Sequence, residues 1–132
     1  MKVASSIVAI DTTATINGAS IDTEGDRFGE LLVFYSLGIQ TGTTPTSTVK
    51  LQDSADDSSF ADIAGAAFSA KAEADDDTQF WGVLDLAKTP VRRYVRAVHT
   101  EGGTATACPI AVLLVLASAS VKPTTTLPEF DI

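Results

Sequence analysis

The sequence predicts an all-β fold, an antiparallel β-sandwich with jelly-roll topology and about eight strands. Three observations predict it. Short segments rich in Val, Ile, Thr and aromatic residues alternate with clusters of Gly, Pro, Ser and Asp. Apolar residues seldom recur at the three- and four-residue spacing of an amphipathic helix. The chain has 132 residues, 45% of them hydrophobic, which is enough for one domain with its own core.

The N-terminal part of the chain is predicted to contain two strands and a hairpin. Residues 3–11 and 30–38 have the composition of strands, and the second segment is apolar at nearly every position, as in a strand covered on both faces. Between them, the pair Asn17-Gly18 separates two alternating stretches. This pair predicts a type I′ hairpin, because both central residues of that turn need a positive φ. Loops are predicted at residues 23–29 and 40–48.

The middle of the chain is less regular. Residues 48–54 alternate until Asp53 interrupts the inward face. Residues 55–63 are predicted to form a polar turn. Residues 64–77 are ambiguous, because their alanines favour a helix but they contain a single large apolar side chain, too few for an amphipathic face. A strand at residues 66–72 followed by an acidic turn is expected.

The C-terminal part is predicted to contain three further strands and an arm. Pro90 cannot donate a backbone hydrogen bond, so it predicts a turn after the first of these strands. The glycines of residues 101–105 predict another turn after the second strand. The final residues contain two prolines and three consecutive threonines, so they are expected to be extended, like polyproline II. The predicted organisation is a body of residues 1–118 and an arm of residues 119–132. The three strands are predicted at residues 78–87, 91–100 and 106–118.

Composition excludes several classes of partner. Seventeen acidic against nine basic residues give a net charge of −8, which argues against nucleic acid and against an anionic membrane surface. The apolar run at residues 110–119 is too short to span a bilayer. Cys108 is the single cysteine, so no internal disulfide can form, and folding in a reducing cytoplasm is expected.

The basic residues of the segment RRYVRAVHT, residues 92–100, form the first candidate site. In a strand, Arg93 and His99 share one face while Arg92 and Arg96 share the other. Neither face is then a continuous basic strip. These charges are expected to be solvated or paired on the sheet, and the alternative is a small basic patch that docks on an acidic surface of a partner.

No catalytic or metal-binding constellation is predicted. His99 and Cys108 fall short of the roughly four ligands of a structural zinc site. Cys108 precedes Pro109 at the start of an apolar strand, where a buried thiol is more common than a nucleophile. The sequence therefore predicts no catalytic residue, no cofactor and no metal, and the protein is not expected to be an enzyme.

Two acidic segments offer an alternative. Four carboxylates in residues 53–62 loosely resemble a calcium loop, but the turn glycine and the final glutamate of an EF-hand are missing. Calcium becomes possible if residues 75–77 lie at the same end of the sandwich. Otherwise, solvated turns with Asp side chains bonded to nearby amides are expected. The four carboxylates belong to Asp53, Asp56, Asp57 and Asp62.

The sequence resembles small structural proteins of tailed bacteriophages. The resemblance is carried by VKLQDSADDSSFADI, FWGVLDL, RRYVRAVHT and ACPIAVLLVLAS, within residues 48–118. It implies a virion component with a jelly-roll body: a capsid decoration (cement) protein that binds the major capsid protein as a homotrimer and stabilises the head. It implies a location on the capsid surface, after assembly in the host cytoplasm.

Two alternatives stay open. One is a tail or neck (head-completion) component. The other is a virion-displayed carbohydrate-binding sandwich, in which Trp81 would be an exposed platform for a sugar, although a place in the core is expected for it.

A decoration protein needs a rigid body and contacts that reach its neighbours. The prolines of the arm lower the entropy lost when an extended segment docks. The apolar residues of the arm are expected to lie outside any core and to insert into a neighbouring subunit. The predicted interface residues are Arg92, Arg93, Arg96, Pro123, Leu127, Pro128, Phe130 and Ile132.

Overall fold

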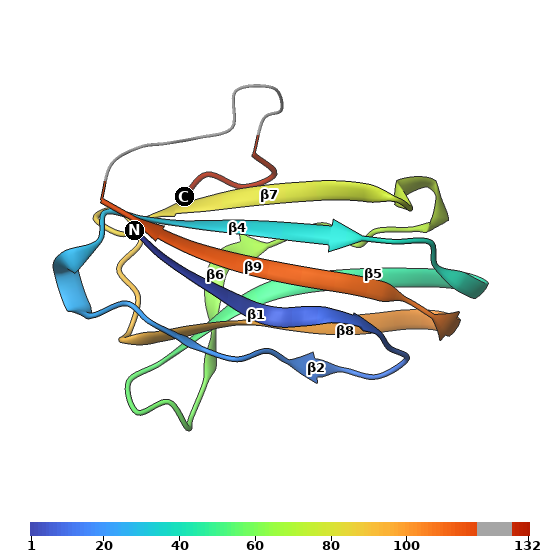
Figure 1. Ribbon diagram of the computed structural model, residues 1–132, viewed down its shortest axis with the longest axis horizontal. Helices are drawn as coiled ribbons and strands as arrows, with labels where there is room; N and C mark the ends of the chain where they lie inside the picture. Colours follow the sequence, from blue (N-terminus) through green and yellow to red (C-terminus); the bar gives the residue numbers. More distant parts are fainter. Residues whose placement is uncertain (119–127) are drawn as a thin grey trace.

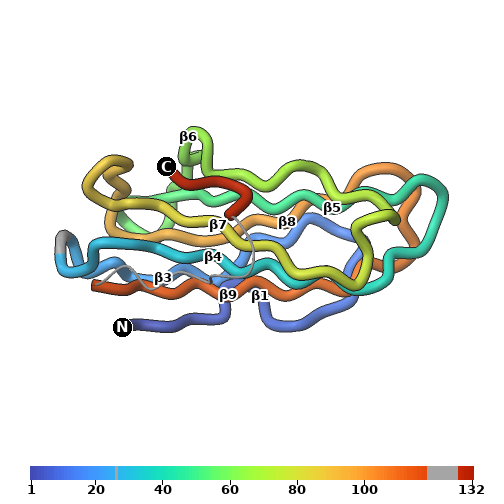
Figure 2. The backbone as a smooth tube through the Cα atoms, turned by 90° about the horizontal axis from the view of Figure 1, so that it is seen from above, coloured from blue at the N-terminus to red at the C-terminus, as the bar shows by residue number. Residues whose placement is uncertain are grey.

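The computed structural model describes residues 1–118 and 128–132, the side chain of residue 26 excepted. In this part of the chain, two antiparallel sheets pack face to face (Figures 1 and 2). Two short 3₁₀ helices, η1 (Gly25–Arg27) and η2 (Glu73–Asp75), lie in the connections. The strands are β1 (Lys2–Asp11), β2 (Ile16–Asn17), β3 (Ile21–Asp22), β4 (Glu30–Leu37), β5 (Thr41–Ser54), β6 (Ala61–Ala67), β7 (Thr78–Asp85), β8 (Tyr94–Ala107) and β9 (Pro109–Ala117).

The strand order confirms the predicted fold class. One sheet has the order β1-β9-β4-β7 and the other the order β2-β8-β5-β6, with β3 also paired to β8. Taken together, β2 and β3 form one interrupted edge strand. Each sheet then combines early and late strands of the chain in the interleaved order of a jelly roll.

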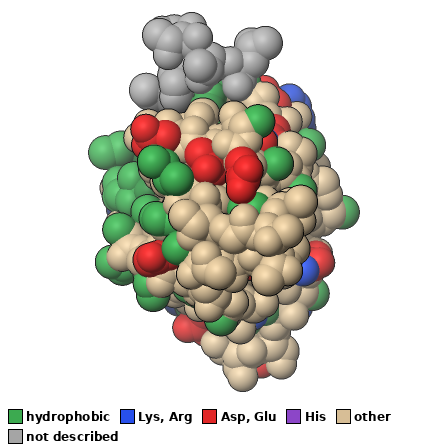
Figure 3. Space-filling view, turned by 90° about the vertical axis from the view of Figure 1, so that its right-hand side faces the viewer, with side chains coloured by type: hydrophobic (Ala, Val, Ile, Leu, Met, Phe, Trp, Pro, Cys, Tyr) green, Lys and Arg blue, Asp and Glu red, His purple; other side chains and the backbone are tan. Residues whose placement is uncertain are grey.

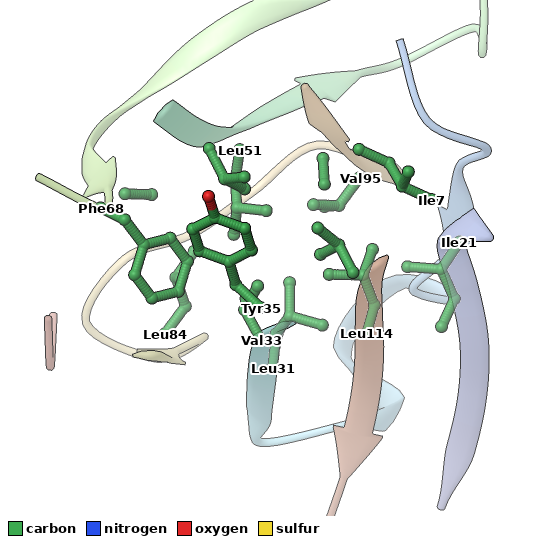
Figure 4. Packing of buried hydrophobic residues seen from close by; sticks show 14 of the residues in the cluster. Ile7, Ile21, Leu31, Val33, Tyr35, Leu51, Phe68, Leu84, Val95 and Leu114 are labelled. Carbon is green, nitrogen blue, oxygen red and sulfur yellow. The ribbon is translucent and has the colours of Figure 1, made fainter. Parts of the chain in front are cut away.

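Period-two alternation builds the core. The odd-numbered residues of β4 point into the core. They pair with the even-numbered residues of β9, which also point inward. Figure 4 shows Tyr35 and Leu114 converging with Leu51 and Val95 from the opposite sheet. On the outer face of β4, Leu32 is also buried. The expectation that both faces of this strand are covered in part is therefore confirmed.

The predicted hairpin at Asn17-Gly18 is wrong. Instead of pairing with each other, the two flanking segments both pair with β8. The backbone N–H of Gly18 donates to the carbonyl of Ala97 at 2.8 Å, and that of Ala19 to Ser6 at 2.7 Å. A Cβ at Gly18 would collide with Ser6 and with the Ala97 carbonyl. Glycine is therefore needed here for close approach between the sheets, rather than for a positive φ.

The two glycine-rich segments predicted as a loop and a turn are strands. Residues 41–48 and 101–105 lie within β5 and β8, which pair along 14 residues each. Gly42 and Gly103 have positive φ values and sit near register shifts of the ladder. The glycines therefore mark bulges in a continuous pair of strands. The chain turns at Cys108 instead, which divides the predicted last strand between β8 and β9.

The strand expected at residues 66–72 begins earlier in the structure. It is β6, which pairs with β5 from Ala61 onwards. Beyond its end, Phe68 and Lys71 continue to bond with the backbone of β5. The polar segment predicted as a turn is shortened accordingly.

Residues 128–132 belong to the body, which corrects the predicted arm. The N–H groups of Val83 and Asp85 on β7 donate to the carbonyls of Phe130 and Ile132 at 2.9 and 2.8 Å. Residues 129–132 therefore form a short parallel extension of this sheet along the edge of β7 (Figure 2). Pro128 begins the extension, whereas Pro123 and Leu127 lie outside the described residues.

The sequence predicted that Phe130 lies outside the core, but the structure places it within the core. Its ring is 8% exposed and meets the ring of Phe68 edge-on, with centroids 5.1 Å apart. The space it fills exists because residue 82 is glycine, whose Cβ would otherwise collide with the ring. Ile132 is half-buried beside it and packs against the same core.

A polar clasp fixes the same segment. The Lys71 side chain, 7% exposed, donates to Glu129 Oε2 at 2.6 Å. Glu129 Oε1 accepts from the N–H and hydroxyl of Ser69 at 2.6 and 2.7 Å. Burial acts to raise the pKa of the Glu129 carboxyl, but the hydrogen bonds from Lys71 and Ser69 outweigh it and hold the pKa below its ordinary value.

The first prediction concerns Phe130. Replacing it with alanine should lower the free energy of unfolding by about 3–5 kcal/mol, because a buried ring is lost and a cavity remains. Urea unfolding followed by circular dichroism measures this loss. The matched control is Ile39→Ala, since Ile39 is 63% exposed and should change stability by less than about 0.5 kcal/mol. Equal, small losses in both variants would mean that residues 128–132 are not part of the folded body.

The second prediction concerns Glu129 and pH. Because the pKa of Glu129 is lowered in the folded state, its contribution is complete above the ordinary carboxyl pKa and is lost as the pH falls through the folded value. Glu129→Gln should therefore cost about 1–3 kcal/mol near pH 7, and the difference from wild type should shrink as the pH falls below the ordinary carboxyl range and Glu129 takes up a proton. Glu73→Gln, at an exposed position, is the control. A Glu129→Gln difference that stays constant with pH would contradict the clasp.

Candidate functional site

The three arginines of the basic segment are all engaged with neighbouring side chains. Arg92 donates through Nε to Asp53 Oδ1 at 2.8 Å, and Arg93 forms an ion pair with Asp22 at 2.9 Å. The hydrogen bond from Arg93 holds the pKa of Asp22 at about 2. The expectation that these charges are paired is confirmed for both residues, but their predicted place on a strand is wrong, because β8 begins at Tyr94 and both arginines precede it.

Arg96 is held differently. Its Nη2 donates to Gln52 Oε1 at 2.9 Å, and its guanidinium carbon lies 3.9 Å from the centroid of the Phe60 ring. The segment therefore does not present a row of uncompensated positive charge. The docking role of these arginines stays a prediction.

The two acidic segments lie at opposite ends of the sandwich (Figure 1). The first follows Ser54, whose β5 position pairs with Tyr94 at the start of β8. The second precedes Thr78, which pairs with Leu37 at the end of β4. The shared end that a calcium site would need therefore does not exist.

In the first acidic segment, the carboxylate of Asp56 is hydrogen-bonded by residues of its own turn. Asp56 Oδ1 accepts from the hydroxyl of Ser54 and from the N–H groups of Ser58 and Ser59, at 2.8–3.0 Å. These backbone and side-chain bonds hold the pKa of Asp56 at about 2. The expected turn, with Asp bonded to nearby amides, is confirmed here.

A buried polar cluster lies between the sheets, near the point where β8 passes into β9. His99 is fully buried on the inward face of β8. Its Nε2 lies 2.7 Å from Ser47 Oγ, and Ser47 in turn shares a hydrogen bond with the hydroxyl of Tyr35. Cys108 Sγ is 3.8 Å from the same nitrogen. The structure thus brings the single histidine and the single cysteine together.

Burial sets the protonation of this cluster. It lowers the pKa of His99 to about 4 and raises the pKa of the Cys108 thiol to about 11. It also raises the pKa of Tyr35. At neutral pH the imidazole is uncharged and the thiol protonated. A thiol in this state is a poor nucleophile, because the thiolate is the reactive form.

Glu101 is the member of this cluster that the sequence analysis missed. Residues 101–105 are predicted as a turn, whereas β8 continues through Glu101 to Ala107. Since side chains two residues apart share a face of a strand, Glu101 lies on the same side as His99. One nitrogen of His99, one carboxylate oxygen of Glu101 and Sγ of Cys108 all lie within 4.8 Å of one another. The sequence signal that could have identified Glu101 is its spacing of two residues from His99, which places both on one face of a strand.

The outer face of the β1-β9-β4-β7 sheet carries exposed apolar side chains. Val3 and Val8 of β1 are 51% and 70% exposed, and Leu113 of β9 is 37% exposed. We call this surface the outer strip; it comprises Val3, Val8, Phe34, Leu113 and Val115. Figure 3 shows apolar side chains gathered along one flank of the molecule.

Trp81 does not form an exposed platform for a sugar. It is 6% exposed and packs with Leu32 and Val83 in a small apolar cluster. Its ring also stacks with that of Phe34, with centroids 6.5 Å apart. The expectation that Trp81 is a packing residue is confirmed.

A shallow groove lies at the end of the sandwich where β4 begins. It is lined by Phe28 and Val91 among apolar residues, and by Arg27 and Arg93. Both arginines are paired, with Glu24 and Asp22. Among the described residues, no helix has the length and apolar character needed to cross a membrane.

Comparison with solved structures shows a likeness that bears on the fold. No protein-family model matches the chain, and no curated protein matches it in sequence. The structure is similar to that of the PBSX exported protein XepA, a phage protein, with a TM-score of 0.59 and 13% identity. The match covers 96% of this chain and 42% of that one. This chain therefore spans less than half of XepA, and the likeness establishes a shared all-β fold.

Proposed function

We propose that this protein is a structural component of a bacteriophage virion: a capsid decoration (cement) protein that binds the lattice of the major capsid protein as a homotrimer and stabilises the head. Two observations support the phage assignment. The sequence resembles small virion proteins over residues 48–118, and the fold resembles that of a phage protein. The position on the capsid surface is part of the proposal.

The observation that carries the proposal is the outer strip together with the edge strand β1. Between Lys2 and Asp11, β1 has no charged side chain. Natural proteins usually protect a long edge strand with charges, prolines or a covering segment, because its unpaired backbone groups recruit other chains. Two register shifts bend β1 after Ser5, but residues 3–5 remain a regular, uncharged edge.

The other edge of the same sheet is protected. Residues 129–132 pair along β7 and close it. Because β7 is closed and β1 is open, another chain would associate at the edge of β1. The exposed apolar side chains of the outer strip lie next to this edge. We infer that this side contacts the capsid lattice, and that three copies in one trimer multiply a weak single contact.

A role in adhesion fits the chemistry of the polar groups better than catalysis does. The Cys108 thiol is buried and protonated, and the His99 imidazole is buried beside it. The groove at the other end holds paired charges. A tail or neck position would use the same outer strip and belongs to the same class of function.

The third prediction tests the outer strip. Val8→Asp places a charge on an exposed position of β1 and should weaken co-sedimentation with phage heads by about tenfold or more, which corresponds to about 1.4 kcal/mol. The matched control is Ile39→Asp, because Ile39 is similarly exposed but lies outside the strip. Light scattering should give a trimer of the 13.7 kDa chain. If Val8→Asp binds heads as wild type does, the outer strip is not the contact.

The fourth prediction separates the segment 119–127 from the body. Replacing these residues with a Gly/Ser linker of equal length keeps residues 128–132 in place and removes Pro123 and Leu127. Attachment to heads should weaken while the thermal midpoint stays within about 2 °C, because a flexible linker loses more entropy on docking. Unchanged attachment would remove these two residues from the proposed interface. Deleting the whole of residues 119–132 is unsuitable, because it also removes Phe130 from the core.

A further inference from the structure

The corner where β8 passes into β9 gathers three side chains of the types that bind transition metals. His99 and Glu101 lie on one face of β8, and Cys108 lies between the end of β8 and the start of β9. Their candidate ligand atoms are all within 4.8 Å of one another. Around a tetrahedral zinc ion, ligand atoms lie about 3.5 Å apart, so small rotations of side chains would close the cluster. The 3.8 Å separation of Cys108 Sγ and His99 Nε2 places the imidazole directly beside the thiol.

A second observation also points to a missing ligand. Nδ1 of His99 and Oε1 of Glu101 are both buried and have no hydrogen-bond partner. Buried polar atoms without partners are uncommon, because each loses its hydration without compensation. His99 is fully buried, and its ring reaches the other two residues. The cluster therefore contains unsatisfied polar atoms at the place where a cation would be held.

We propose that His99, Glu101 and Cys108 bind a divalent cation of the zinc class. An imidazole nitrogen, a thiolate and a carboxylate are the ligand types that zinc takes in proteins. On binding, the thiol releases its proton to solvent, and the thiolate and carboxylate cancel the two positive charges. The buried complex then has no net charge, which removes the main cost of placing an ion between the sheets.

The surrounding residues complete the site. Gln40 is buried, and its amide nitrogen donates to Asp76 Oδ1 at 2.9 Å, which turns the amide oxygen towards Cys108 Sγ, 3.9 Å away. In the proposed site this oxygen is the fourth donor. Ser47 lies on β5, the neighbour of β8 in the same sheet, and its bonds to Tyr35 and to Nε2 of His99 orient the imidazole. Nδ1 is then the nitrogen left to bind the ion, and a supporting bond to the other ring nitrogen is typical of a ligating histidine.

Glu101 gives the cation a route to the site. It is half-buried, whereas His99 and Cys108 are inaccessible. An ion can therefore meet the carboxylate first and then the two inner ligands. Because β8 and β9 belong to different sheets, a bound ion would fasten the sheets to each other at this corner.

The test uses the purified full chain after treatment with a chelator. Zn²⁺ titrated by calorimetry should bind at one equivalent and raise the thermal midpoint. Co²⁺ as a probe should give the charge-transfer absorption of a cobalt–thiolate bond and the strong visible bands of tetrahedral coordination. Zn²⁺ should also slow alkylation of Cys108 in mild denaturant, since a ligating thiolate is protected.

Variants decide whether these residues are the ligands. Cys108→Ala should abolish the cobalt–thiolate absorption, and Glu101→Gln should weaken Zn²⁺ affinity by at least about tenfold. Asp77→Asn is the control, because it removes one exposed negative charge elsewhere and should leave affinity unchanged. Glu101→Gln keeps the test valid if Cys108→Ala fails to fold. Absence of binding at one equivalent, or equal binding by wild type and Glu101→Gln, would overturn the proposal.

Discussion

The long antiparallel pairing of β5 with β8 is the constraint on which the rest of the structure depends. It runs from Thr41 opposite Ala107 to Ser54 opposite Tyr94. This register decides which side chains face inward on both strands. It also decides where β8 ends, and therefore where the chain crosses to the other sheet and inserts β9 between β1 and β4. A shift of one residue would turn every inward side chain of either strand to solvent.

The same register explains how a polar cluster comes to lie inside an apolar core. Along β8, Val95 and Ala97 precede His99 on the inward face, and Ser47 of β5 is paired with Glu101. The apolar half of the pair fills the middle of the sandwich, while the polar half faces the corner beside Cys108. Polar groups in this position are held by the geometry of the ladder, so they can be left without hydrogen-bond partners at a cost that the rest of the core offsets.

Sequence patterns predicted the elements whose signals are local. The apolar segments of β4, β7 and β1 were identified because composition and alternation act within each strand. Glycine was misleading at Gly18 and Gly103, since a turn, a bulge and a close approach all require the same residue. Phe130 was misplaced because the space it fills is created by Gly82, far away in the chain. Glu101 was missed for the same reason: its role depends on where β8 ends, and that is decided by β5.

The two edges of the β1-β9-β4-β7 sheet connect the fold to the proposed function. The chain uses its last described residues to close the edge at β7, with backbone bonds, the Phe130 ring and the Glu129 clasp. Three separate interactions protect one edge, whereas β1 keeps uncharged backbone and exposed valines at the other. An isolated domain under selection for solubility would be expected to protect both edges. Protection of one edge alone is what the proposed function requires, because a virion subunit would have its other edge covered in the assembled particle.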